Sequence, residues 1–245
     1  MYEDQKKIDD QCCELLNKGI ICESTSAYAS LVTLQFKKHG LSSRKEDRMC
    51  IDYCDLNRII APESQPFPLI EDIIAKTRGC SYFLVFDINS AFHSIPINEE
   101  DRHKTAFVTQ CNHYKWRSLP FGLKTSAAAF QRILSEIIRR YGLSEFAINY
   151  LDNILIFSKT FHEHLVHIQK LVDALYTEGF CLNFAKYSFA SSRIQYLGHI
   201  LTPNSVEPLS DNVRAITEFP VPNSHCTIRQ FLGKVNFYRK FIPNS

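Results

Sequence analysis

Residues 146–157 read FAINYLDNILIF, two apolar runs interrupted only by Leu151, Asp152 and Asn153. Such runs on either side of a short polar segment predict two antiparallel strands joined by a tight turn. A carboxylate between buried strands is costly unless a positive group lies beside it. An ordinary Asp-Asn turn also explains the pair, because both residues tolerate left-handed backbone conformations.

A second carboxylate makes a functional explanation more attractive. The continuously apolar run Tyr82 to Phe86 leads directly into Asp87, which predicts a buried strand that ends in an acid. If Asp87 and Asp152 lie on adjacent strands, they can hold a pair of Mg²⁺ ions about 3.5 to 4 Å apart. Such a pair activates an attacking 3′-hydroxyl and stabilises a leaving pyrophosphate. The two acids therefore indicate polymerase chemistry.

The rest of the chain alternates helical and strand patterns without an internal repeat. The predicted helices are a segment ending at Lys18, Leu69 to Lys76, a helix capped by Thr125 or Ser126 and running to Tyr141, a helix using Leu165, Ile168, Leu171, Val172 and Leu175, Leu209 to Glu218, and Thr227 to Phe241. The predicted strands are Leu31 to Phe36, a strand beginning at Arg48, two short strands around Phe107 and Tyr114, and the region from Tyr187 to Leu201. The polar stretch from Lys37 to Asp47 predicts a basic-tipped hairpin.

Composition favours an ordinary folded protein with a large core. The 245 residues are 45% hydrophobic and 22% charged, and the net charge of +2 requires any polyanion binding to come from local Lys and Arg clusters. The nine cysteines form no CxxC pair and are interpreted as reduced thiols. The sequence has neither a signal-peptide pattern nor an apolar run of membrane-spanning length, which predicts an intracellular protein, cytoplasmic or in a virus-like particle, with no membrane partner.

Two further groups of side chains receive the more ordinary interpretation. Tyr114 and Trp116 are predicted to be packing residues, since aromatic content alone does not indicate base stacking. His162, His164 and His167 share one predicted helix, and their spacing fits a solvated face that is not a metal site.

Four blocks in order resemble reverse transcriptases. Residues 150–153 (YLDN) resemble the YxDD box with its last carboxylate replaced by an amide, and residues 86–93 (FDINSAFH) resemble the preceding catalytic block. Residues 119–124 (LPFGLK) resemble the block that closes over the nucleotide, and residues 196–199 (YLGH) resemble the primer-gripping hairpin. The details RMCIDY (48–53), KTAF (104–107), FLG (231–233) and FYR (237–239) look like the Pol polyproteins of gypsy-type long-terminal-repeat retrotransposons, which are Metaviridae-like. The similarity covers nearly the whole chain.

This resemblance implies an α+β, right-hand polymerase fold. A ferredoxin-like palm is expected over about 63–94 and 126–202, with a fingers lobe over about 1–62 and 95–125. The start of a thumb is expected over 203–245. The implied activity is RNA-directed DNA synthesis with Mg²⁺ or Mn²⁺, using deoxynucleoside triphosphates on an RNA or DNA template with a primer.

The resemblance also implies roles for individual residues. The catalytic positions are Asp87, Asp152 and Asn153, and the metal ligands are Asp87, Asp152 and the carbonyl of Ile88. The nucleotide-binding residues are Arg48, Phe92, Phe121 and Gly122, assisted by one of Lys37, Lys38, Arg44 or Lys45. The residues that contact template or primer are Gln131, Tyr150, Leu197 and Gly198. Alone, Phe92 would more often be a core residue, Arg48 a surface ion-pair partner and Gln131 a solvated helix residue.

Departures from the family pattern leave two functions open. The pattern places Asp at Asn153 and Arg at Cys54, and loss of a carboxylate beside divalent cations predicts weaker metal binding and a slower reaction. The chain is therefore either a reverse transcriptase impaired by Asn153 or a catalytically inactive, retrotransposon-derived protein that binds nucleic acid. No ribonuclease H pattern or integrase zinc site follows Ser245, so those activities are expected on a longer precursor or on other chains.

Overall fold

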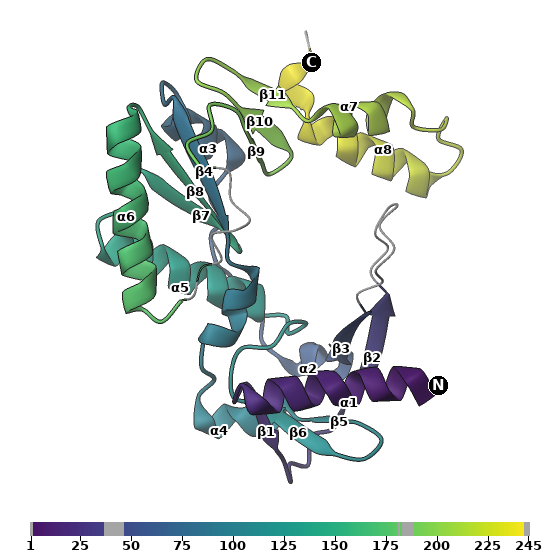
Figure 1. The fold of residues 1–245 in the computed structure, drawn as a ribbon. Helices are drawn as coiled ribbons and strands as arrows, with labels where there is room; N and C mark the ends of the chain where they lie inside the picture. Colours follow the sequence, from purple (N-terminus) through teal and green to yellow (C-terminus); the bar gives the residue numbers. More distant parts are fainter. Residues whose placement is uncertain (1, 37–46, 181, 183–188, 243–245) are drawn as a thin grey trace.

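The computed structural model describes residues 2–36, 47–180, 182 and 189–242 (Figure 1). In Figure 1 the palm lies above the fingers lobe, and the helices of the thumb region lie beside the palm at the upper right. The basic residues Lys37, Lys38, Arg44 and Lys45, predicted to assist nucleotide binding, lie outside the described residues.

The fingers lobe is built on a five-stranded sheet with the order β1-β6-β5-β2-β3. Its strands are β1 (Ile21–Glu23), β2 (Ser30–Phe36), β3 (Asp47–Asp52), β5 (Phe107–Val108) and β6 (His113–Trp116). The helices of this lobe are α1 (Tyr2–Asn17), α2 (Cys54–Ile59) and α4 (Glu99–Arg102), with the short 3₁₀ helix η2 (His103–Thr105). The apolar face of α1 packs on this sheet through Ile8 and Cys12. Tyr114 and Trp116 are buried there, which confirms them as packing residues.

The palm has the chain order of a ferredoxin-like βαββαβ unit. Its strands β4 (Tyr82–Asp87), β7 (Ala147–Tyr150) and β8 (Asn153–Ser158) form an antiparallel sheet with the order β4-β8-β7. Its helices are α3 (Ile70–Thr77), α5 (Ser126–Arg140) and α6 (Phe161–Thr177), and the 3₁₀ helix η1 (Asn89–Ser94) follows β4. A bridge from Phe83 to Ser191 extends the free edge of β4, in the position of a fourth strand.

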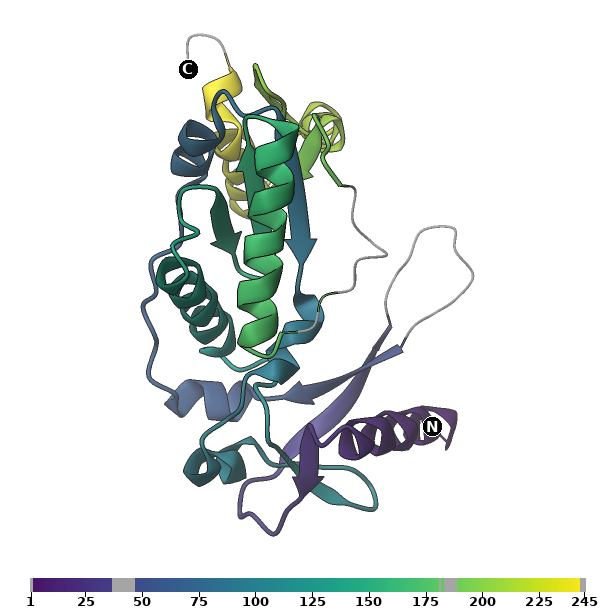
Figure 2. The same ribbon diagram turned by 60° about the vertical axis from the view of Figure 1, so that its left-hand side comes forward.

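Both faces of the palm sheet are buried, which explains why its strands read as continuous apolar runs. Leu84, Phe86 and Ile156 point to the layer formed by α5 and α6, which lie on the same side of the sheet in Figure 2. Phe83 and Leu155 point the other way, toward α3 and the next sheet. Alternation along each strand thus divides one apolar run between two cores.

The chain then forms a second three-stranded sheet and two helices. The strands are β9 (Ile194–Tyr196), β10 (His199–Leu201) and β11 (Val206–Pro208), and the helices are α7 (Ser210–Thr217), α8 (His225–Phe237) and the 3₁₀ helix η4 (Arg239–Phe241). The predicted helix over Thr227 to Phe241 is therefore interrupted at Tyr238. Tyr187, where the predicted strand region begins, lies outside the described residues; from Phe189 onward the region starts with a turn and the isolated bridge at Ser191, and its first regular strand begins at Ile194.

Pairing of β10 with β11 carries this sheet across residue 202, where the palm was predicted to end. The sheet is therefore shared between the expected palm and thumb segments.

The histidine face of α6 differs from the prediction. His164 is fully buried, and the Ser158 hydroxyl lies 2.9 Å from its Nδ1 and 2.8 Å from Nδ1 of His167. Burial lowers the pKa of His164 to about 4, so its ring is neutral near pH 7. By contrast, Leu165, predicted to face the core, is 50% exposed. The other predicted core residues of this helix, Ile168, Leu171, Val172 and Leu175, do pack in the core, so the prediction is wrong only at its first turn, where His164 is buried in place of Leu165.

The N-terminus of α5 also differs from the prediction. Neither Thr125 nor Ser126 caps the helix with its side chain, and the Ser126 hydroxyl instead donates to the Pro120 carbonyl at 2.7 Å. This bond fastens the helix to the loop that precedes it.

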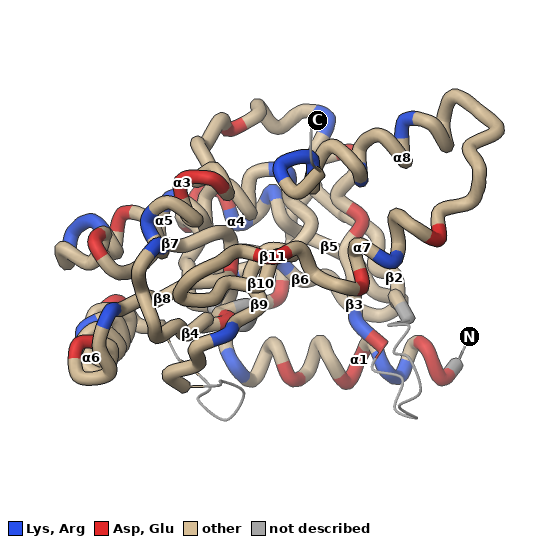
Figure 3. The backbone as a smooth tube through the Cα atoms, turned by 90° about the horizontal axis from the view of Figure 1, so that it is seen from above, with Lys and Arg blue, Asp and Glu red and all other residues tan. Residues whose placement is uncertain are grey.

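Acidic and basic residues both lie along α1 (Figure 3). In the parts of the chain that the structure describes, no helix combines the length and hydropathy needed to cross a bilayer.

Candidate active site

Strand register brings the three predicted catalytic positions to one end of the palm sheet. Asp87 on β4 lies opposite Asn153 on β8, and Tyr150 on β7 lies opposite Asn153 from the other side. The Ile88 N–H donates to the Asp152 carbonyl at 2.8 Å, which ties the end of β4 to the β7–β8 turn. Backbone pairing thus holds together two segments that are far apart in the sequence, and such pairing is a more rigid support for a site than a loop.

The electrostatics of Asp152 show that the two carboxylates interact. Burial raises the pKa of Asp152 above its ordinary value, and the negative charge of Asp87 raises it further, against a lowering by the backbone N–H of Asp152 itself. Asp87 is exposed, whereas Asp152 is half-buried. Because the second negative charge is unfavourable at this site, a cation bound there would stabilise the ionised form of Asp152.

Asn153 completes this site with an amide. Its Nδ2 donates to Oδ1 of Asp152 at 3.0 Å, so one carboxylate oxygen is already occupied. Among the residues the structure describes, no three or more His, Cys, Asp or Glu side chains gather as a metal-binding group. The oxygens of Asp87, Asp152 and the Ile88 carbonyl are the hard donors that Mg²⁺ and Mn²⁺ prefer, so the residues fit a divalent cation with fewer charges than three acids would provide.

A network of side-chain hydrogen bonds stabilises the turn that carries Asp152. Leu151 has a left-handed backbone (φ 53°), which costs a non-glycine residue roughly 1 to 2 kcal/mol. Its N–H donates to Oε1 of Gln131 at 2.6 Å, and Nε2 of Gln131 donates to the Asn149 carbonyl at 3.2 Å. The Asn149 amide donates back to the Gln131 carbonyl at 3.1 Å, and the Ser135 hydroxyl donates to Oδ1 of Asn149 at 3.0 Å.

This network changes the interpretation of Gln131. The residue was expected to contact the template, but its side chain is fully buried and its polar atoms are used by the turn. Asn149 and Ser135 were not among the predicted site residues. The available signal was Asn149 itself, a polar residue inside an apolar strand.

Three of the predicted nucleotide-binding residues, Phe92, Phe121 and Gly122, lie where the fingers meet the palm. Phe92 is buried and stacks on Phe130, with ring centroids 4.2 Å apart, and its other neighbour is Phe121 at 4.6 Å. Phe121 is 48% exposed, so it forms the outer end of this aromatic stack. Gly122 adopts φ 92°, and its carbonyl accepts from the Asn57 amide at 2.8 Å.

Arg48, the fingers residue expected to bind phosphates, is not part of this stack. It is exposed on β3, opposite Gln35 of β2.

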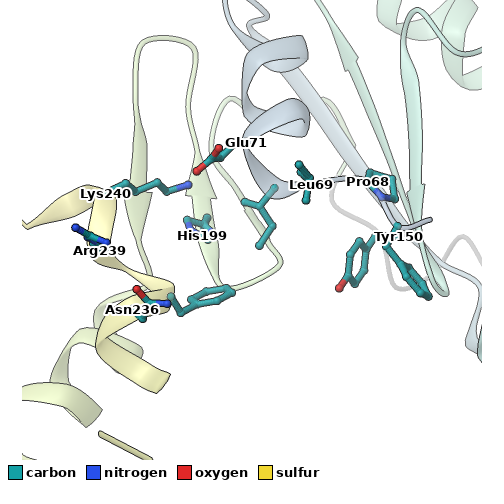
Figure 4. Close-up of a pocket in the computed structure, with 11 residues that line it drawn as sticks. Pro68, Leu69, Glu71, Tyr150, His199, Asn236, Arg239 and Lys240 are labelled. Carbon is teal, nitrogen blue, oxygen red and sulfur yellow. The ribbon is translucent and has the colours of Figure 1, made fainter. Parts of the chain in front are cut away.

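Leu197 and Gly198, the predicted primer contacts, form the turn between β9 and β10. An open cleft of about 680 Å³ lies nearby and is lined by Tyr150, by His199 and by residues of the segments 67–71 and 236–240 (Figure 4). Tyr150, beside the carboxylates, and His199, beside Gly198, therefore border the same cleft.

A palm sheet that ends in two interacting carboxylates, between fingers and thumb segments, defines the right-hand class of nucleic-acid polymerases. Residues 36–201 match the family model described as reverse transcriptase (RNA-dependent DNA polymerase). The chain belongs to this reverse transcriptase family, and its retrotransposon resemblance is confirmed by the relatives that follow.

Three curated relatives align with 238 residues, 97% of the chain. The retrovirus-related Pol polyproteins from transposons 297 and opus of Drosophila melanogaster are 39% and 34% identical. The transposon Tf2-3 polyprotein of Schizosaccharomyces pombe is 33% identical. The chain spans 22%, 24% and 17% of these three proteins, respectively.

Solved structures confirm the fold class. A foamy viral protease-reverse transcriptase in complex with double-stranded DNA superimposes with a TM-score of 0.82 at 23% identity, over 94% of this chain and 39% of that one. The same kind of protein in complex with an RNA/DNA hybrid gives a TM-score of 0.79 at 21% identity, over 97% and 31%.

Proposed function

We propose that the chain is the polymerase core of an RNA-directed DNA polymerase that extends a primer on an RNA or DNA template. The observation that carries the proposal is the convergence of Asp87 and Asp152 at the ends of paired strands. Family membership makes nucleotidyl transfer the reaction that such a pair serves.

In this proposal Asp87, Asp152 and the Ile88 carbonyl hold Mg²⁺ or Mn²⁺. When bound, the metal supplies Lewis-acid chemistry that favours ionisation of the primer 3′-hydroxyl and neutralises charge on the leaving pyrophosphate. Asn153 contributes an amide oxygen at most, and its Nδ2 competes for Asp152. The expected result is a working but slow enzyme.

The aromatic stack selects the sugar of the incoming nucleotide. Phe92 is pressed between Phe130 and Phe121, so its ring cannot easily move aside for a 2′-hydroxyl. Arg48 binds the triphosphate as a cation, and Gly122 allows close backbone approach of the nucleotide. Deoxynucleoside triphosphates are therefore the proposed substrates.

Tyr150, Leu197 and Gly198 are proposed to contact the primer strand. The support is that Tyr150 and His199, the neighbour of Gly198, border one cleft next to the carboxylates. The structural neighbours are complexes with double-stranded DNA and with an RNA/DNA hybrid.

The amide at residue 153 favours a second candidate function. Because Asn153 places an amide beside Asp87 and Asp152 in place of a third carboxylate, the chain is alternatively a nucleic-acid-binding protein without turnover.

Primer extension distinguishes the two functions. The purified chain is expected to add deoxynucleotides to a labelled primer on an RNA template with Mg²⁺ or Mn²⁺, and EDTA should abolish the addition, because the metal sustains the proposed reaction. If the chain shows no extension but binds a primed hybrid, with an affinity that falls steeply as salt rises, it is the inactive binding protein. Binding that is absent or insensitive to salt contradicts both candidates.

Substitution of Gln131 tests the support of the turn. Gln131→Leu keeps the apolar volume but leaves the Leu151 N–H and the Asn149 carbonyl without their side-chain partner. We expect the free energy of unfolding to fall by about 1 to 3 kcal/mol and kcat to fall roughly tenfold or more, while the Kd of primed template changes little. Gln169→Leu, on the exposed face of α6, is the matched control. A large loss of template affinity in Gln131→Leu, with kcat preserved, would instead support a direct template contact.

A further inference from the structure

The β9–β10 turn has an unfavourable backbone that its surroundings must stabilise. Both central residues are left-handed, Leu197 with φ 47° and Gly198 with φ 77°. This is the backbone of a tight two-residue hairpin turn, but leucine adopts it only at a cost. The turn therefore needs contacts that fix it, and its two carbonyl groups show where these contacts come from.

The Leu197 carbonyl is held within the hairpin, whereas the Gly198 carbonyl is held from elsewhere in the chain. Nδ1 of His199 lies 3.0 Å from the Leu197 carbonyl. The Gly198 carbonyl accepts from the Leu209 N–H at 3.2 Å and from the Tyr238 hydroxyl at 2.9 Å. Tyr238 lies between α8 and η4, forty residues further along the chain.

Tyr238 is itself fixed in place. It is buried, and its hydroxyl accepts from the Asn212 amide of α7 at 2.6 Å while it donates to Gly198. Its ring lies 5.5 Å from the ring of His199, which is also flanked by Phe237 at 5.4 Å and Phe241 at 5.7 Å. Figure 4 shows Asn236, Arg239 and Lys240 of the same segment around His199. The end of α8 thus packs directly on the hairpin.

Gly198 fits this contact because it has no side chain. A Cβ on Gly198 would lie 3.0 Å from the Tyr238 hydroxyl and 3.3 Å from Nδ2 of Asn212. The space beside its Cα is therefore taken by the thumb region.

We infer that Tyr238 is a positioning residue that couples the thumb region to the primer-contacting turn, by holding the Gly198 carbonyl from α8 and α7. This inference rests on the proposed function, because it assumes that Leu197 and Gly198 contact primer. Movement of α8 shifts the turn through one hydroxyl group. Release of the hydroxyl loosens the turn without removing the β9–β10 pairing or the Leu209 bond.

Replacement of Tyr238 by Phe tests the inference, because it removes the hydroxyl and keeps the ring. We expect amide exchange at Leu197 to His199 to speed up about fivefold or more, and the Kd of primed template to rise by a similar factor. The KM for deoxynucleotide should change much less, since the substitution does not reach the carboxylates. Tyr176→Phe, at a tyrosine that is 80% exposed, is the matched control.

A double-mutant cycle with Gly198→Ala adds a second readout. Alanine at this position is strained by its φ and also crowds the Tyr238 hydroxyl, so part of its effect should disappear in the Tyr238→Phe background. Strictly additive effects would overturn the coupling. The inference is also wrong if exchange speeds up in Tyr238→Phe while primer affinity stays at the wild-type value. If the unmodified chain neither binds nor extends a primed template, the proposed function fails first, whatever the exchange data show.

Discussion

Substitution of Asp152 by Asn is expected to lower nucleotide incorporation by at least about a hundredfold, a loss of roughly 2.7 kcal/mol of transition-state stabilisation. The site would retain Asp87 as its one carboxylate beside two amides at residues 152 and 153. The backbone should not change, because the bond from Ile88 to residue 152 uses the main-chain carbonyl. Single-turnover primer extension with saturating deoxynucleotide measures the loss directly.

Although Asp152→Asn is expected to lose activity, its thermal stability should not fall. The folded-state pKa of Asp152 is raised, so ionisation of this acid costs the fold free energy at every pH above its unfolded-state pKa. A neutral amide removes that cost, and the metal-free Asp152→Asn protein should have a Tm near neutral pH at least equal to that of the original chain. Low activity combined with a lowered Tm would indicate damage to the fold instead. Asp55→Asn, whose side chain is 93% exposed, controls for the loss of one charge and should keep its activity.

The palm strands were predictable because burial on both faces leaves a continuous apolar signature. The runs at Tyr82 to Phe86 and Ile154 to Phe157 carry that signature, and the acid at the end of the first run is visible in the sequence. The pairing of Asp87 with Asn153 is a matter of register, which sequence pattern alone leaves open. The order of the family blocks, rather than periodicity, made the pairing of these strands an expectation.

The support of the site was less predictable, because it depends on contacts between distant residues. Helical spacing placed Gln131 and His164 off the apolar face of their helices, and both side chains are buried. Each has a polar partner on a strand, Asn149 for Gln131 and Ser158 for Nδ1 of His164. A polar residue with a partner can occupy a core position, and the pattern of apolar residues does not reveal the partner.

Tyr238 was missed for a related reason. The segment 237–239 was used only as part of a family resemblance. The hydrogen bond from Tyr238 to the Gly198 carbonyl joins residues that are forty positions apart in the chain. A glycine in a tight turn already has a local explanation in its backbone angles. No pattern in the sequence therefore indicated that Gly198 also contacts the end of α8.

Restoration of a carboxylate by Asn153→Asp is expected to raise incorporation by at least about tenfold, the size of effect typical of losses at the ligands that support metal sites. Two physical changes act in the same direction. The substitution removes the amide that donates to Oδ1 of Asp152, which frees that oxygen, and it adds a negative charge where divalent cations are expected. Measurement of incorporation across a Mg²⁺ titration should show a higher rate at a lower metal concentration.

In the absence of metal, the added negative charge should lower the thermal stability of the protein. A third acid beside Asp87 and Asp152 raises the pKa of Asp152 further, so the metal-free Asn153→Asp protein should have a lower Tm than the original chain, and Mg²⁺ should raise that Tm more strongly. Asn112→Asp, which adds the same charge at an exposed position in the fingers, should show neither effect.

Equal rates for the original chain and Asn153→Asp would mean that the amide is not what limits the reaction. If Mg²⁺ raises the Tm of Asn153→Asp but incorporation stays absent, the metal site is repaired and the defect lies elsewhere, as expected for the inactive nucleic-acid-binding protein.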